Sequence, residues 1–154
     1  MEHERIHTRF PIKCEIPVRF TDVDIYNLVN NARYFTFMEE ARLAYFEKIS
    51  DLKIVGQKSF PKGAVLSGAS CRFISPTRLG EVVVSAVGVV KLDRFTFTME
   101  YRMSEKNSGR PLARGSSVQV AFDFVQGKKI EISSSIVEEI LGLEKSHVLA
   151  SPTE

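Results

Sequence analysis

The stretch Asn31-Ala-Arg-Tyr-Phe-Thr-Phe-Met-Glu-Glu-Ala-Arg-Leu-Ala-Tyr-Phe-Glu-Lys-Ile49 decides how the rest of the chain must fold. Its apolar side chains recur at helical spacing and cover most of the circumference of a helix. The polar strip that remains is narrow and consists of Arg33, Thr36, Glu40 and Glu47. Asn30 is a suitable N-cap, because a short side-chain oxygen can accept a hydrogen bond from the helix start. The sequence therefore predicts a long helix that other elements bury.

Strand-like alternation flanks this helix on both sides. Residues 12–20 alternate strictly between apolar and polar side chains, and Pro17 among them favours an edge strand or a bulge. Four further strands are expected over residues 64–74, 81–91, 94–103 and 113–125, with turn-forming residues between them. The apolar side of the last strand consists of Val118, Val120, Phe122 and Phe124. A capping-box match at Ser135 and Glu138 predicts a short helix over residues 136–143, and we expect residues 147–154 to be frayed.

These elements predict an α+β fold in which five antiparallel strands wrap around one long central helix. A chain of 154 residues is typical of a single domain, here residues 1–154 with a core over about 12–126. Such a sheet leaves open edges and a thinly polar outer face. We therefore expect two or more copies of the chain to associate.

The composition excludes several classes of function. Lys and Arg number 21 against 19 Asp and Glu, and a net charge of +2 is too small for a general nucleic-acid-binding surface. The longest apolar run, residues 82–90, is far shorter than the roughly 18 residues of a membrane span. The N-terminal residues do not match a secretory signal, so we expect a cytoplasmic protein. Cys14 and Cys71 form no CxxC pair and are expected to be buried, reduced thiols.

The usual catalytic motifs are absent from the sequence. His3, His7 and His147 all lie in the terminal segments, which argues against a Ser-His-Asp or Cys-His catalytic group. The chain has no GxSxG turn, nucleotide-binding glycine motif, HExxH helix or zinc-type spacing of Cys and His. We therefore expect no metal and no cofactor. Any chemistry must depend on carboxylates, amides, hydroxyls or backbone dipoles.

Residues 18–42 combine three features: an acidic pair spaced by one residue, Asp22 and Asp24; an amide pair, Asn30 and Asn31; and a helix that carries Glu39-Glu-Ala-Arg42. This segment resembles the signature of hotdog-fold acyl-CoA thioesterases of the 4-hydroxybenzoyl-CoA thioesterase type, and residues 74–83 look like the turn after that family's second strand. The resemblance covers residues 12–126. It implies a hotdog fold, hydrolysis of an acyl-CoA to a free acid and coenzyme A without a cofactor, and a homodimer or homotetramer with active sites at the subunit interfaces.

The resemblance also implies roles for particular residues. It places the catalytic acid at Asp24 and the backbone N–H donors at Asn30 and Asn31. Such donors at the positive end of a helix dipole can stabilise the oxyanion that forms on a thioester carbonyl. A nearby carboxylate can attack that carbonyl or activate a water molecule, and both roles remain open. Asp22 is expected to be a loop acid that binds nearby backbone.

One departure from the family pattern lies in the loop before the helix. Where many relatives have Gly-His, this chain has Asn27-Leu28 and so lacks an imidazole in the loop. Asn is the non-glycine residue that best tolerates a positive φ, so the loop shape can be kept. This departure leaves open a non-catalytic acyl-CoA-binding protein. A further alternative, which does not depend on it, is a thioesterase acting on acyl carrier protein. For the phosphates of coenzyme A, the candidates are three basic residues at expected strand ends, Arg78, Lys91 and Arg94.

Overall fold

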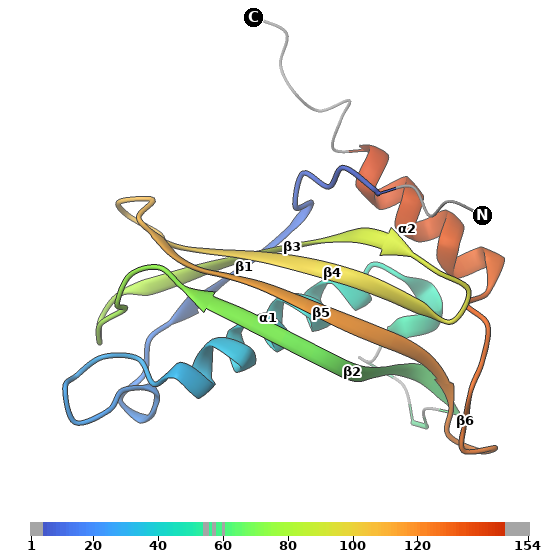
Figure 1. The fold of residues 1–154 in the computed structure, drawn as a ribbon, viewed down its shortest axis with the longest axis horizontal. Helices are drawn as coiled ribbons and strands as arrows, with labels where there is room; N and C mark the ends of the chain where they lie inside the picture. The colour runs from blue at the N-terminus through green and yellow to red at the C-terminus, as the bar shows by residue number, and fades with distance from the viewer. Residues whose placement is uncertain (1–4, 54–55, 57, 60, 147–154) are drawn as a thin grey trace, which may run out of the picture.

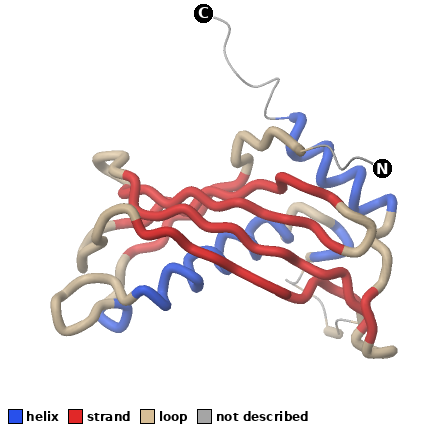
Figure 2. Tube along the Cα trace, viewed as in Figure 1, coloured by secondary structure: helices blue, strands red, loops and turns tan. Residues whose placement is uncertain are grey.

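The computed structural model describes residues 5–53, 56, 58–59 and 61–146. A single antiparallel sheet curls around the long helix α1, Asn31–Phe46, as Figure 1 shows. The strands are β1 (Ile12–Pro17), β2 (Lys62–Phe73), β3 (Val82–Leu92), β4 (Thr96–Glu105), β5 (Pro111–Asp123) and β6 (Lys128–Lys129). Their order across the sheet is β1-β3-β4-β5-β2, with β6 paired to β5 (Figure 2). The predicted α+β fold is confirmed. The two-residue strand β6 and two short 3-10 helices, η1 (Phe20–Asp22) and η2 (Ser50–Leu52), were not expected.

Helix α1 lies in the concave face of the sheet. Its buried side chains are Tyr34, Phe37, Met38, Ala41, Tyr45 and Phe46. The rings of Phe46 and Phe97 meet edge to face with their centroids 6.0 Å apart, which ties the end of the helix to β4. Phe35 and Leu43 are 40% and 37% exposed. The prediction of burial around most of the circumference is therefore wrong on this side, because the sheet covers only one side of the helix.

The middle of the core-facing side of β5 is polar, although buried alanines lie toward its ends. Ser117 and Gln119 are both 1% exposed and pair with the buried residues Met99 and Phe97 of β4. The apolar side of the alternation in this strand, which includes Val118, therefore faces away from α1. The Gln119 Nε2 donates to the Ser117 Oγ at 2.6 Å, so the buried amide is bonded within its own strand.

The two edges of the sheet differ in how they are covered. Strand β1 pairs only with the first half of β3, and Pro17 ends it, as expected of an edge strand. The rest of β3 is covered by the N-terminal segment, whose Ile6 N–H donates to the Val90 carbonyl, and by a C-terminal helix. Strand β2 runs for 12 residues and none of them is buried. This long edge is open in the single chain.

The C-terminal helix α2, Ser134–Ser146, packs against β3. It is capped by Ser133, whose Oγ accepts from the Ile136 N–H at 3.2 Å, so the expected cap at Ser135 is wrong by two residues. The buried Glu144 accepts through Oε1 from the Tyr45 hydroxyl at 2.8 Å and from the Val89 N–H at 2.7 Å. These bonds join α2 to both α1 and the sheet. The expected fraying of residues 147–154 lies outside the described residues.

Both cysteines are free thiols. Cys14 on β1 and Cys71 on β2 are half-buried, and burial raises the pKa of each thiol to about 11. The Glu40 carboxylate raises the pKa of Cys14 further. Both thiols are therefore protonated at neutral pH, which makes them poor nucleophiles.

Candidate active site

The loop between β1 and α1 is held by Asp22. Its side chain is 7% exposed, and its Oδ2 accepts from the Arg19 N–H at 2.8 Å. The Arg33 Nε lies 3.6 Å from the Asp22 Oδ1, so the helix contributes a cation to the same carboxylate. The interpretation of Asp22 as a loop acid is confirmed by these bonds.

Asp24 lies two residues further along the loop and is exposed. Its Oδ1 accepts from the Tyr26 N–H at 2.8 Å and from the Leu28 N–H at 3.3 Å. Its backbone N–H donates to the Leu28 carbonyl at 2.8 Å. Asn27 completes the turn with a φ of 61°, the left-handed conformation predicted for it. The carboxylate is thus fixed through Oδ1, while Oδ2 has no hydrogen bond among the described residues.

The start of α1 leaves one backbone donor free. Asn30 is the N-cap, and its Oδ1 accepts from the Ala32 N–H at 2.9 Å, as predicted. The Asn30 N–H itself donates to the Asp22 carbonyl at 2.8 Å. The expectation that Asn30 supplies an oxyanion donor is therefore wrong, because this N–H already holds the loop. The Asn31 N–H has no acceptor in the described part of the chain and remains available.

Asp24 and Asn31 line the same hollow, which has a volume of about 250 Å³. Its other wall is the end of β2, where Phe73 packs edge to face on Tyr34 with ring centroids 5.1 Å apart. The Tyr34 hydroxyl is bonded to the Thr77 hydroxyl at 2.9 Å, and burial raises the pKa of this tyrosine. The site thus combines a carboxylate oxygen, a helix N-terminus and apolar walls. Tyr34 lies in the first segment that carries the family resemblance, residues 18–42, whereas Phe73 comes directly before the second, residues 74–83.

The three basic residues expected to bind coenzyme A do not lie together. Arg78 forms a backbone bridge with Leu28, so it borders the Asp24 loop. Lys91 and Arg94 lie at the opposite end of the sheet from that loop, at the turn between β3 and β4 (Figure 1). There Lys91 pairs with Asp93 at 3.2 Å, and Arg94 pairs with Glu131. Of the three, only Arg78 lies next to the Asp24 loop, and it is not among the residues that line the hollow.

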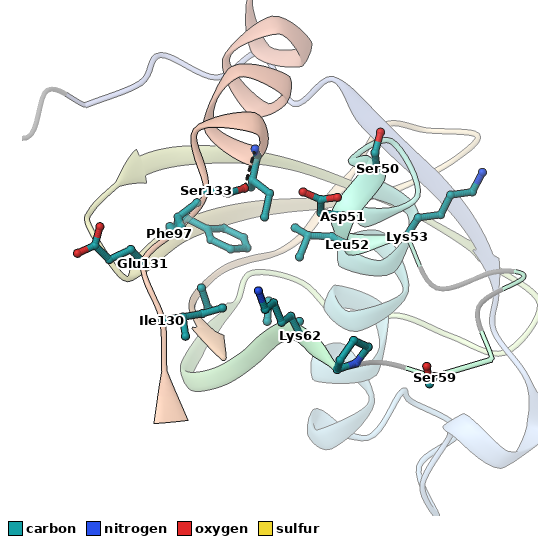
Figure 3. Close-up of a pocket in the computed structure, with 16 residues that line it drawn as sticks. Ser50, Asp51, Leu52, Lys53, Ser59, Lys62, Phe97, Ile130, Glu131 and Ser133 are labelled. Carbon is teal, nitrogen blue, oxygen red and sulfur yellow. Dashed lines mark hydrogen bonds between the residues drawn. The ribbon is translucent and has the colours of Figure 1, made fainter. Parts of the chain in front are cut away.

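Two larger hollows lie around the start of β2. Figure 3 shows one of about 440 Å³, with Leu52, Phe97 and Ile130 among its walls. The other, of about 410 Å³, lies between α1 and β2 and is bordered by Arg42 and Gln119. Gln119, which borders this second hollow, is a buried polar side chain that faces the core. The alternation of apolar and polar residues in the sequence does not reveal its burial. No cluster of three or more His, Cys, Asp or Glu side chains that could bind a metal occurs among the described residues.

Comparison with known proteins shows which family and fold the chain resembles. A family model described as "Thioesterase-like superfamily" matches residues 18–140, which include the loop, α1 and the whole sheet except β1. Among curated proteins, the chain is 23% identical over 141 residues to the uncharacterized protein YsmA of Bacillus subtilis, and the match covers 92% of each chain. No described helix has the length and apolar character that a membrane crossing requires.

Solved structures give the same result. The chain is similar to a thioesterase of Thermus thermophilus that was crystallised with coenzyme A and zinc. The two sequences are 29% identical, the TM-score is 0.76, and the match covers 88% of this chain and 96% of that one. It also shares the fold of a 1,4-dihydroxy-2-naphthoyl-CoA thioesterase of Synechocystis, at 20% identity and a TM-score of 0.73, covering 84% and 95% of the two chains. The expected hotdog fold is confirmed by these matches.

Proposed function

Because the chain belongs to the thioesterase-like superfamily, we propose that it hydrolyses acyl-CoA thioesters in the hollow between the Asp24 loop and the start of α1. The observation that carries the proposal is that a carboxylate with a free oxygen and an unpaired helix N–H line one hollow. The similar thioesterase of Thermus thermophilus, crystallised with coenzyme A, supports coenzyme A as the carrier.

The chemistry assigns separate tasks to the two groups. The Asn31 N–H and the positive end of α1 stabilise the negative charge that develops on the thioester oxygen. The free Oδ2 of Asp24 either attacks the carbonyl carbon or removes a proton from an attacking water molecule. Attack forms a mixed anhydride as the C–S bond breaks and the thiolate leaves, and water then cleaves the anhydride. Both routes yield a carboxylic acid and coenzyme A.

Assembly of two or more copies is part of the proposal. The open edge of β2 and the exposed Phe35 and Leu43 on α1 lie on neighbouring elements. Pairing of two β2 edges would satisfy their free backbone groups and cover these side chains. We expect a homodimer or homotetramer in which each hollow is completed by a second copy, and sedimentation analysis would show a mass of two or four chains. A monomer at micromolar concentration would contradict this part of the proposal.

The test is thiol release from short, medium, long and aromatic acyl-CoAs by the wild type and by Asp24→Asn. Asn keeps the shape of the side chain and removes its charge, so we expect turnover to fall by about 10²–10⁴-fold with little change in melting temperature. Asp51→Asn makes the same change at an exposed acid near the other end of the fold and should leave turnover unchanged. Equal hydrolysis by wild type and Asp24→Asn would refute the role of Asp24. Release from acyl carrier protein but not from coenzyme A would refute the carrier.

A further inference from the structure

The outer face of the sheet carries a row of three arginines. Arg72 of β2 pairs with Arg114 of β5, which in turn pairs with Arg102 of β4. Neighbouring strands lie about 4.8 Å apart, so the three Cα atoms fall within roughly 10 Å. The adjacent residues Cys71 and Tyr101 pack into the core, so the arginine side chains project from the face opposite α1. This arginine row is distinct from the hollow that contains Asp24.

Among the described residues, no carboxylate forms an ion pair with the arginines of this row, although Glu100 lines the same hollow. Arg72 and Arg114 have no ion pair or hydrogen bond to any described residue, and like charges directly opposite each other destabilise a sheet. The carboxylate in the next cross-strand row, Glu100, is engaged by Arg5 at 2.7 Å. Such an arrangement is stabilised when an anion binds across the guanidinium groups.

The row borders a hollow that can hold a ligand. The hollow has a volume of about 400 Å³, within the range of small-molecule sites. Besides the arginines, its walls include Ser70 and Ser116, which are cross-strand neighbours and provide hydroxyl donors. Guanidinium and hydroxyl groups together are typical of phosphate recognition.

One arginine is held in place by the N-terminal segment. The Arg102 guanidinium carbon lies 4.3 Å from the centroid of the Phe10 ring, and Phe10 is only 7% exposed. Phe10 has a φ of 56°, an unusual conformation for a bulky residue, which its N–H stabilises by donating to the Thr8 Oγ1 at 3.0 Å. Thr8 packs on Gly88, where an added Cβ would collide with its hydroxyl. The buried Phe10 ring thus fixes the position of one guanidinium group.

We propose that the arginine row Arg72–Arg114–Arg102 and its hollow bind a ligand bearing two or more phosphate groups. Two sources share this chemistry. One is the nucleotide end of coenzyme A, which carries a diphosphate and a 3′-phosphate, and this source rests on the proposed function. The other is a free phosphorylated metabolite, which does not depend on it.

The first measurement is binding without catalysis. Inorganic pyrophosphate and adenosine 3′,5′-bisphosphate are titrated into the full-length wild type and Arg114→Gln by calorimetry at low salt. We expect Arg114→Gln to weaken binding about tenfold or more, because it removes charged hydrogen bonds at the centre of the row. Lys128→Gln is the matched control, since it removes one charge from an exposed residue paired with Asp123, at the far end of β5 from Arg114, and should change the affinity less than about twofold. A wild type that binds neither probe, or an Arg114→Gln variant that binds both equally well, would overturn the proposal.

A second measurement separates the two sources. The KM is measured for an acyl-CoA and for the same acyl group on N-acetylcysteamine, which lacks the nucleotide. If the row holds the nucleotide end, Arg114→Gln raises the KM for acyl-CoA about tenfold and leaves the KM for the truncated thioester unchanged. If both KM values are unchanged while probe binding is lost, the ligand is a free metabolite. A change of oligomeric state in Arg114→Gln without any probe binding by the wild type would assign the row to contact between copies and overturn the proposal.

Discussion

Replacing Asn31 by proline tests the oxyanion donor without removing a side chain that the site uses. Proline lacks the backbone N–H, and it is well tolerated at the first position of a helix. Asn31 is that first position, and the preceding Asn30 has φ −62° and ψ 138°, an extended conformation that is compatible with a following proline. The helix should therefore form in Asn31→Pro with a melting temperature close to that of the wild type.

The expected magnitude follows from the hydrogen bonds at the helix start. The Asn30 N–H is bonded to the Asp22 carbonyl, and the Ala32 N–H is bonded to the Asn30 Oδ1. The Arg33 N–H donates to the Asn30 carbonyl at 2.9 Å. Asn31 therefore supplies the one free donor of this turn within the described residues. Loss of one oxyanion donor lowers kcat by about 10²–10³-fold, or about 2.7–4 kcal/mol, and we expect a loss in this range.

The assay is thiol release at saturating acyl-CoA, with kcat compared among the wild type, Asn31→Pro and Asn31→Ala. Asn31→Ala is the matched control, because it removes the same side chain and keeps the N–H. We expect its kcat to remain within about threefold of the wild type, a change of under about 1 kcal/mol. The reasoning is refuted if the proline variant folds and retains wild-type kcat, or if both variants lose activity equally.

Two further predictions concern stability. Tyr45→Phe removes the hydroxyl that donates to the Glu144 carboxylate. Hydrogen bonds to charged groups contribute about 1.5–3 kcal/mol to stability. We therefore expect the free energy of unfolding in urea to fall by about 2 kcal/mol and the Tm by about 4–8 °C. A loss below about 0.5 kcal/mol would contradict the role of this bond. The hydroxyl and N–H of Ser108 lower the pKa of Glu105, so its contribution to stability is present above its unfolded value of about 4.3 and is lost as the pH falls through its folded pKa. Thermal melts should therefore show Glu105→Gln less stable than the wild type at pH 7, with a difference that shrinks as the pH falls through the lowered pKa of Glu105. A difference that stays the same size at all acidic pH values would refute the assignment.

Local signals in the sequence predicted the parts of the site that depend on neighbouring residues. The N-cap at Asn30 follows from a short amide side chain ahead of a helical pattern, and the positive φ of Asn27 follows from residue type. The engagement of the Asn30 N–H could not be predicted, because it depends on where the Asp22 carbonyl lies in the folded loop. Residue types at a helix start indicate which donors exist, and only the fold determines which of them remain free.

Features that depend on the position of a strand in the sheet were beyond sequence reasoning. Lys91 and Arg94 are basic residues at a strand end, as expected, but the antiparallel order puts that end opposite the Asp24 loop. On β5 the apolar alternation suggested one buried side, yet the pairing with β4 turns Ser117 and Gln119 toward α1. Burial of these polar groups is tolerated because the Tyr101 hydroxyl, Ser117 and Gln119 hydrogen-bond to one another.

The spacing of the two loop aspartates explains how one short segment both builds and equips the site. Val23, between the two aspartates, bridges back to Val29. Asp22 is buried and uses its carboxylate on the Arg19 N–H and its carbonyl on the Asn30 N–H, so it fixes the loop against the helix start. Asp24 is exposed and needs only Oδ1 to hold its own turn. Because the first acid takes up the structural task, the second keeps an oxygen without a hydrogen bond to any described residue, in the hollow that Asn31 also lines, and the proposed thioester hydrolysis rests on this arrangement.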